Sequence, residues 1–190
     1  DMGLIQGIDT PFEIANIFPQ AQTSEQIEVG LKYHAGRFRL AAFPFYSKLS
    51  NVSSQQVLSD STGTLYTPPP VFGQIETYGI EIEGDAELTE WATLRTAITL
   101  QNPKASGFGV WIQDATLTPG NETLLPTPKG DADNNPKIMT RSTLTLKPTA
   151  AAKVFLNHSY LGKRAANREN AFYLPGHHTF DLGASYEFGE

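Results

Sequence analysis

One short segment of this 190-residue chain has the side chains of a possible calcium site. In Asp131-Ala132-Asp133-Asn134-Asn135, side-chain oxygens occupy the first, third and fifth positions, which is the opening spacing of a calcium-binding loop. Pro136 stands where such a loop needs Gly, and Ser142 stands where it needs a bidentate Glu. The segment is therefore interpreted as a polar loop, and no metal is expected there.

Histidines offer two further chemical possibilities. His177-His178 together with Asp181 could ligate a metal, and His158 beside Ser159 has the residue types of a hydrolase. Adjacent residues of a strand point to opposite faces, so neither pair converges unless the chain turns there, and no nucleophile-elbow motif surrounds Ser159. We expect no catalytic residues, no cofactor and no enzymatic activity.

Aromatic and arginine side chains in long polar segments are the best candidates for ligand contacts. Such residues could stack on, or pair with, an anionic iron chelate. The alternative, which the sequence favours, is that they pack loop against loop or belong to an aromatic girdle. The candidates are Tyr66, Phe108, Trp111, Arg164 and Arg168.

The elements that must position these residues are strands. Between Tyr78 and Leu88 every second residue is apolar or small, while the residues between them are Gly79, Glu81, Glu83, Asp85 and Glu87. This period of two predicts a strand with a different solvent on each face. Similar alternation recurs in 27–33, 92–101 and 179–188, and more roughly in 38–46, 138–146 and 152–160, where Pro44 is expected to bend or end its strand. We predict about seven strands and no helix.

The connections alternate in length. Links 33–37, 88–92 and 147–152 are short, whereas 47–77, 102–136 and 162–178 are long and rich in Ser, Thr, Asn, Pro and Gly. Short turns at one end and long loops at the other are typical of an antiparallel, up-and-down transmembrane β-barrel. The chain is thus predicted to be one all-β, partial barrel domain, with an outer loop in 1–24, hairpins in 25–46, 78–101 and 137–160, and a last strand in 179–188. Its expected lumen-facing residues are Glu28, Glu81, Glu83, Arg95, Arg141 and Asp181.

Composition is compatible with this prediction. The net charge of −6 and the pI near 5.2 disfavour nucleic acid as a partner, which needs a basic surface. Cysteine is absent, and no apolar run is long enough for a transmembrane helix. Seven strands are an odd number, whereas bacterial single-chain barrels have even numbers, so the chain is expected to be part of a larger barrel.

Several motifs, in this order, resemble those of TonB-dependent outer-membrane receptors. The segment 23–33 resembles a barrel segment of that family, and Tyr78-Gly79-Ile80-Glu81-Ile82-Glu83-Gly84 resembles its G-x-E-x-E-G strand. Asn135-Pro136 resembles the proline-led return into the barrel. The segment 174–182, which begins Leu174-Pro175 and runs on into 185–188, resembles the L-P-x-Y-x-x-x-D-L segment.

The resemblance implies a function that the residues alone do not. Members of the family import iron-siderophore complexes, haem, cobalamin or oligosaccharides through a 22-stranded barrel that an N-terminal plug closes. This chain would form about seven strands of that wall in a bacterial outer membrane. The implied partners are outer-membrane lipid, a small-molecule ligand such as a ferric siderophore, and TonB through a plug domain that is not in this chain.

Two other hypotheses remain open at this point. A self-contained barrel of eight strands, either an adhesin or a structural protein, would need an additional strand from 2–17. A soluble β-sandwich binding module would bury its apolar faces against each other and would have short connections at both ends.

Overall fold

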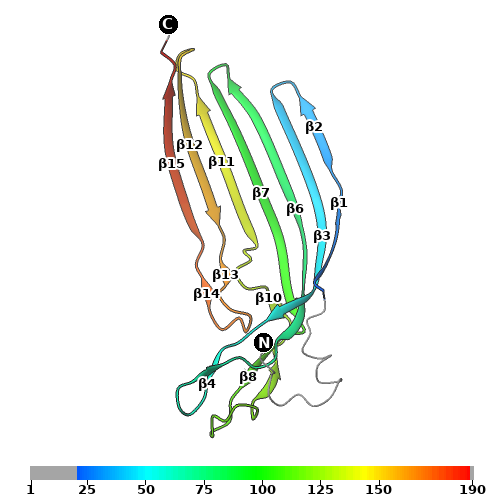
Figure 1. Ribbon diagram of the computed structural model, residues 1–190. Helices are drawn as coiled ribbons and strands as arrows, with labels where there is room; N and C mark the ends of the chain where they lie inside the picture. The colour runs from blue at the N-terminus through cyan, green and yellow to red at the C-terminus, as the bar shows by residue number, and fades with distance from the viewer. Residues whose placement is uncertain (1–20, 189–190) are drawn as a thin grey trace, which may run out of the picture.

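A computed structural model describes residues 21–188, and these form an open antiparallel sheet with no helix among them (Figure 1). Its strand order is β1-β3-β6-β7-β11-β12-β15, with β2 also pairing β3 and β10 also pairing β7. Within the described range, no helix is long and apolar enough to cross a membrane. The strands of this sheet are β1 Thr23–Glu28, β2 Leu31–Ala35, β3 Phe38–Ser54, β6 Val71–Thr89, β7 Ala92–Ser106, β10 Gly130–Asp131, β11 Ile138–Leu146, β12 Ala152–Leu161 and β15 His177–Tyr186.

The predicted fold class is confirmed. Long strands follow one another up and down, and each pairs antiparallel with its neighbour in the chain order. The β-sandwich hypothesis is wrong for residues 21–188, because no second layer covers the apolar face of the sheet. Large hydrophobic side chains on that face, among them Leu31, Leu40 and Phe180, are at least half exposed. The additional strand required by the eight-stranded hypothesis lies outside the described residues.

Pro44 does not end its strand, which is one of the two effects predicted for it. β3 continues through it to Ser54, and the interruption falls instead on the neighbouring edge, between β1 and β2. The register on both sides of the gap places Val29 opposite Pro44. Val29 N–H donates to the Pro44 carbonyl over 3.1 Å, but Pro44 has no N–H to return. The two short strands are therefore one edge strand with a missing ladder bond.

The two ends of the sheet differ as the link lengths predicted. Tight turns join β2 to β3, β6 to β7 and β11 to β12 at one end, where Gly36 turns the chain at a φ of 56°. Small strands gather at the other end (Figure 1). They are β4 Leu58–Ser59, β5 Leu65–Tyr66, β8 Gly109–Ile112, β9 Thr123–Pro126, β13 Arg164–Ala165 and β14 Tyr173–Leu174.

The loops are shorter than predicted because the strands run further. β3 and β6 remain paired as far as Ser54 and Val71, and β7 continues to Ser106. At the N-terminal side, β1 begins at Thr23, within the predicted outer loop, while residues 1–20 of that loop lie outside the described range.

The two faces exchange character along the strands. A row made of Ile27, Tyr46, Tyr78 and Asn102 crosses four strands on the apolar face. One step beyond this row, toward the loops, the same face carries Glu25, Lys48, Glu76, Lys104 and Asp131. At that level the opposite face becomes apolar, with Ile75 and Ala105 packing into a small core around Phe108 and Ala132. We call the first row the boundary row.

Candidate functional site

The polar face of the sheet carries a continuous transverse row of hydrogen-bonding side chains. Cross-strand pairing puts its members side by side on seven consecutive strands. Within the row, Arg95 Nε donates to Asp85 Oδ1 over 2.6 Å, and Arg39 Nη2 lies 3.8 Å from Asp85 Oδ2. The row consists of His34, Arg39, Asp85, Arg95, Thr143, Asn157 and Asp181.

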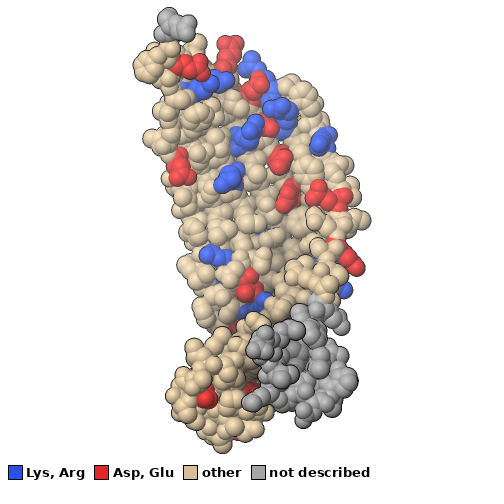
Figure 2. Space-filling view, in the orientation of Figure 1, with Lys and Arg blue, Asp and Glu red and all other residues tan. Residues whose placement is uncertain are grey.

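All six residues predicted to face a lumen lie on this polar face. Arg95 and Asp181 belong to the row itself, and Glu83 and Arg141 flank Ala97 in the next row. Glu81 and Glu28 follow at the same parity. Charged side chains of both signs are interspersed over the sheet face seen in Figure 2. That this face borders a lumen stays a prediction, but its residues are brought together.

Neither pair of neighbouring residues considered for chemistry, His177 with His178 or His158 with Ser159, lies on one face of the sheet. His158 lies on the apolar face, where its Nε2 is 2.9 Å from Nδ1 of His178 and its ring stacks on Phe180. Ser159 and His177 lie on the opposite, polar face. Across residues 21–188, no group of three His, Cys, Asp or Glu side chains is placed to hold a metal ion.

Two of the ligand candidates pack loop against loop. The backbone N–H of Trp111 donates to Oε1 of Gln56 over 2.9 Å, and the indole Nε1–H of Trp111 donates to the Pro69 carbonyl over 2.9 Å. The Tyr66 hydroxyl donates to Glu122 Oε1, which holds the pKa of Glu122 below its usual value. These bonds join the β3–β6 loop to the β7–β11 loop, as the packing alternative proposed.

Phe108 and Arg168 meet in the small core. Phe108 is only 3% exposed, and its ring packs against Gly73, where a Cβ would lie 2.6 Å from it. The Arg168 guanidinium carbon is 3.9 Å from the Phe108 ring centroid, and Arg168 Nε donates to Asp133 Oδ1 over 3.2 Å. Because Phe108 is buried, its ring has no surface left for a ligand; the sequence could not show this burial, since it comes from the exchange of the two faces.

Arg164 remains as a candidate for ligand contact. It lies in β13, and its Nη1 is buried without a hydrogen-bond partner among residues 21–188. A buried guanidinium N–H without an acceptor is costly, which makes an incoming acceptor favourable there.

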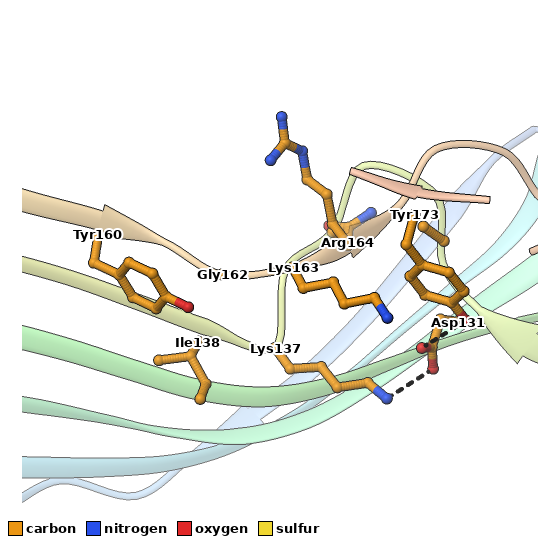
Figure 3. A pocket seen from close by; sticks show the side chains of 10 residues that line it. Asp131, Lys137, Ile138, Tyr160, Gly162, Lys163, Arg164 and Tyr173 are labelled. Carbon is orange, nitrogen blue, oxygen red and sulfur yellow. Dashed lines mark hydrogen bonds and ion pairs between the residues drawn. The ribbon is translucent and has the colours of Figure 1, made fainter. Parts of the chain in front are cut away.

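Sequence reasoning missed a basic cluster around Asp131. Lys104 Nζ and Lys137 Nζ lie 2.6 Å and 3.0 Å from the same Asp131 oxygen. Lys163 Nζ lies 4.5 Å from the Tyr173 ring centroid. These residues line a pocket of about 370 Å³ or stand beside it (Figure 3). Their cations come from three strands or loops far apart in sequence, so no local motif marks them.

Comparison with known proteins decides the family. The sequence profile of the family described as "TonB dependent receptor-like, beta-barrel" matches residues 7–190. The chain belongs to this TonB-dependent receptor family. No curated protein sequence matches the chain.

Solved receptors share this fold at low sequence identity. The ferric yersiniabactin uptake receptor FyuA from Yersinia pestis is 15% identical, with a TM-score of 0.56 over 87% of this chain and 22% of its own. The siderophore receptor PiuA from Acinetobacter baumannii is 14% identical, with a TM-score of 0.58 over 89% of this chain and 22% of its own. The ferric-catecholate import receptor Fiu from E. coli K12 is 17% identical, with a TM-score of 0.54 over 88% of this chain and 22% of its own. The chain therefore spans about a fifth of the length of these receptors.

In this receptor chain, the charge of Asp131 makes the loop end sensitive to acid. Burial acts to raise the pKa of Asp131, but hydrogen bonds from Lys104 and Lys137 outweigh it and hold the pKa below its usual value. A carboxyl group whose pKa is depressed by folding stabilises the fold above its unfolded pKa of about 3.9, and this stabilisation is lost as pH falls through the folded pKa.

We expect the backbone amide of Asp131, which donates to Asn170 Oδ1 over 2.7 Å, to lose protection from hydrogen exchange below about pH 4. Exchange rates corrected for their intrinsic pH dependence would measure this. Asp131→Asn should show weaker protection at neutral pH and little further change on acidification. Protection that is equal at pH 7 and pH 3 in the unmutated protein would contradict the prediction.

Proposed function

We propose that this chain is part of the wall of an outer-membrane receptor for the energised uptake of a small ligand such as an iron-siderophore complex. The observation that carries the proposal is a single sheet layer with a continuous polar row on one face and exposed hydrophobic side chains on the other. A water-soluble fold would cover the apolar face, whereas a barrel wall leaves it to lipid.

On this proposal, each face and each end of the sheet has a role. The polar face, with Glu28, Glu81, Glu83, Arg95, Arg141 and Asp181, borders the lumen. The loop end, with its small strands, lies outside the cell, and the tight turns lie in the periplasm. Energy would reach the receptor from TonB through a plug domain outside this chain. The wall needs no catalytic residue for this function.

The function is tested by uptake measurements on the complete protein that contains this chain. Cells that express it as their only such receptor would be given radiolabelled iron on hydroxamate, catecholate and mixed chelators. We expect accumulation of at least one chelate, and loss of accumulation when TonB is deleted or the proton-motive force is collapsed. Equal accumulation with and without TonB would overturn the proposal.

The candidate ligand contacts differ in whether their side chains are already buried or paired within the loops. These candidates are Tyr66, Phe108, Trp111, Arg164 and Arg168. The first three are engaged in packing or are buried. Arg168 is paired with Asp133 through Nε, although its Nη1, like that of Arg164, is buried without a hydrogen-bond partner among residues 21–188. Among residues 21–188 Arg164 makes no ion pair, unlike Arg168, so Arg164 is the main candidate for contact with an anionic chelate.

We expect Arg164→Gln to weaken binding of the transported chelate by roughly tenfold or more, because a charged hydrogen bond contributes about 1.5–3 kcal/mol. Equilibrium titration of the purified receptor with the chelate would measure it. Arg37→Gln, at the turn end of the sheet, is the matched control and should bind as the unmutated receptor does. Unchanged affinity in Arg164→Gln would remove this residue from the ligand site without affecting the uptake proposal.

A further inference from the structure

The basic cluster around Asp131 lies on the outside of the proposed wall, not in its lumen. Lys104 pairs across the sheet with Glu76, two residues from Tyr78 in the boundary row, so it shares the face of Tyr78 and Ile80. Asp131 pairs directly with Lys104 on that same face. The cluster therefore stands immediately beyond the boundary row, at the level where the apolar face becomes charged.

Cations outnumber anions in this cluster, although the chain as a whole carries a charge of −6. Asp131 is shared between Lys104 and Lys137, and thus neutralises one of them. Within the described residues, Lys163 makes no ion pair, and its Nζ faces the ring of Tyr173. Figure 3 shows Lys137, Lys163 and Tyr173 extending toward the Asp131 side of the pocket, while the Arg164 guanidinium points away from them. Arg164 lines the same pocket, but its guanidinium group is directed away from the cluster, so the ligand contact proposed for it uses different atoms.

The pocket is amphipathic. Its other wall is formed by Ile138 and Tyr160, which belong to the apolar face and continue into Leu100, Ile98 and Ile82. Ile138 and Leu100 are 43% and 41% exposed. An occupant with an anionic head and an apolar tail would meet lysines at the loop end of the pocket and aliphatic side chains on the side toward the middle of the sheet. A free anion would leave the apolar part of the pocket unused.

From this arrangement we propose that the pocket binds the phosphate group of an outer-leaflet lipid, whose acyl chain lies along Ile138 and Leu100. Lys137 and Lys163 supply N–H donors and positive charge to the phosphate, and Lys104 adds to the field. Basic side chains at the membrane surface attract anionic headgroups in this way. The inference depends on the membrane placement in the proposed function, but not on which ligand is transported.

The test compares two lipids that differ only in the phosphate. The complete receptor, purified in detergent, would be titrated with a phosphatidic acid and with the diacylglycerol of the same acyl chains, and bound lipid counted by native mass spectrometry. We expect phosphatidic acid to bind at least tenfold more tightly. The double variant Lys137→Gln/Lys163→Gln should lose about 25-fold in affinity for it, at about fivefold for each lysine. Asp131 keeps Lys104 as its partner in this variant, so the loop end should remain folded.

Lys153→Gln is the matched control. Lys153 lies on β12 at the turn end and pairs only loosely with Glu187, at 3.5 Å. Its loss should leave phosphatidic acid binding unchanged. Equal binding of the two lipids, or unchanged affinity in the double variant, would overturn the proposal. Inorganic phosphate that binds as tightly as phosphatidic acid would also overturn it, by reducing the pocket to an anion site. Uptake measurements are independent of these outcomes, so failure of one proposal is distinguishable from failure of the other.

Discussion

Ile98→Arg is expected to lower the free energy of unfolding of the receptor in a bilayer by about 2–4 kcal/mol. Ile98 lies on the apolar face near the middle of β7, with Ile82 and Thr140 as its cross-strand neighbours. At that depth an arginine has no carboxylate beside it on its own face and must be taken from water into hydrocarbon. Urea titration of the receptor reconstituted in a bilayer, followed by tryptophan fluorescence, would measure the change.

The matched control is the adjacent residue. Thr99→Arg places the same side chain on the polar face, directly across from Glu81. We expect the free energy of unfolding to change by no more than about 0.5 kcal/mol, since the new charge stays in water and has an opposite charge beside it. If both variants are destabilised equally, the assignment of the two faces to lipid and lumen is wrong.

Most of the fold could be predicted because strand alternation is a local signal. The carboxylates at Glu81 and Glu83 mark one face of β6 without knowledge of any other strand, and the register then carries that face across the sheet. The positions of the tight turns could be predicted from the short links, one of which contains Gly36, a residue that readily adopts the positive φ found there. The family motifs added the larger barrel, which no single strand encodes.

Two features escaped prediction because they depend on pairing between distant segments. Beyond the boundary row the apolar parity changes sides, so alternation read from Tyr78 onward gives no warning that Ile75 packs inward and Glu76 outward. The effect of Pro44 was misplaced for a similar reason. The missing N–H of Pro44 interrupts the neighbouring edge strand, between β1 and β2, whereas β3 itself is continuous.

The candidate site shows the same division. Tyr66 and Trp111 were found by residue type, but whether they face a ligand or another loop depends on Glu122 and Gln56, which are about 55 residues away in sequence. The lysines around Asp131 are likewise separated by long stretches of chain. Sequence reasoning identified side chains suited to binding, and only the paired strands determine which of them remain available.

Phe108→Ala is expected to have the second large effect, confined to the loop end. The ring fills the space beside Gly73 and lies under Arg168, and truncation of a buried phenylalanine costs about 3–5 kcal/mol. Since local openings are governed by local stability, the population in which β8 and β9 open should rise more than 100-fold. Limited proteolysis at the turn around Leu117 and Gly120, compared with hydrogen exchange of Gly109–Ile112, would detect it.

Phe172→Ala separates this packing effect from the mere loss of an aromatic ring at the same end. Phe172 is 58% exposed, so its truncation should change cleavage rates little. The hydrophobic residues packed against the Phe108 core, Val52 and Ile75, lie on the loop side of the boundary row. Hydrogen exchange of the sheet between the boundary row and the tight turns should therefore be unchanged in both variants. If Phe108→Ala instead loosened the β11–β12 pairing near Leu144 and Leu156, the loop end and the wall would form one cooperative unit. In that case the loops could not rearrange around a ligand without cost to the barrel.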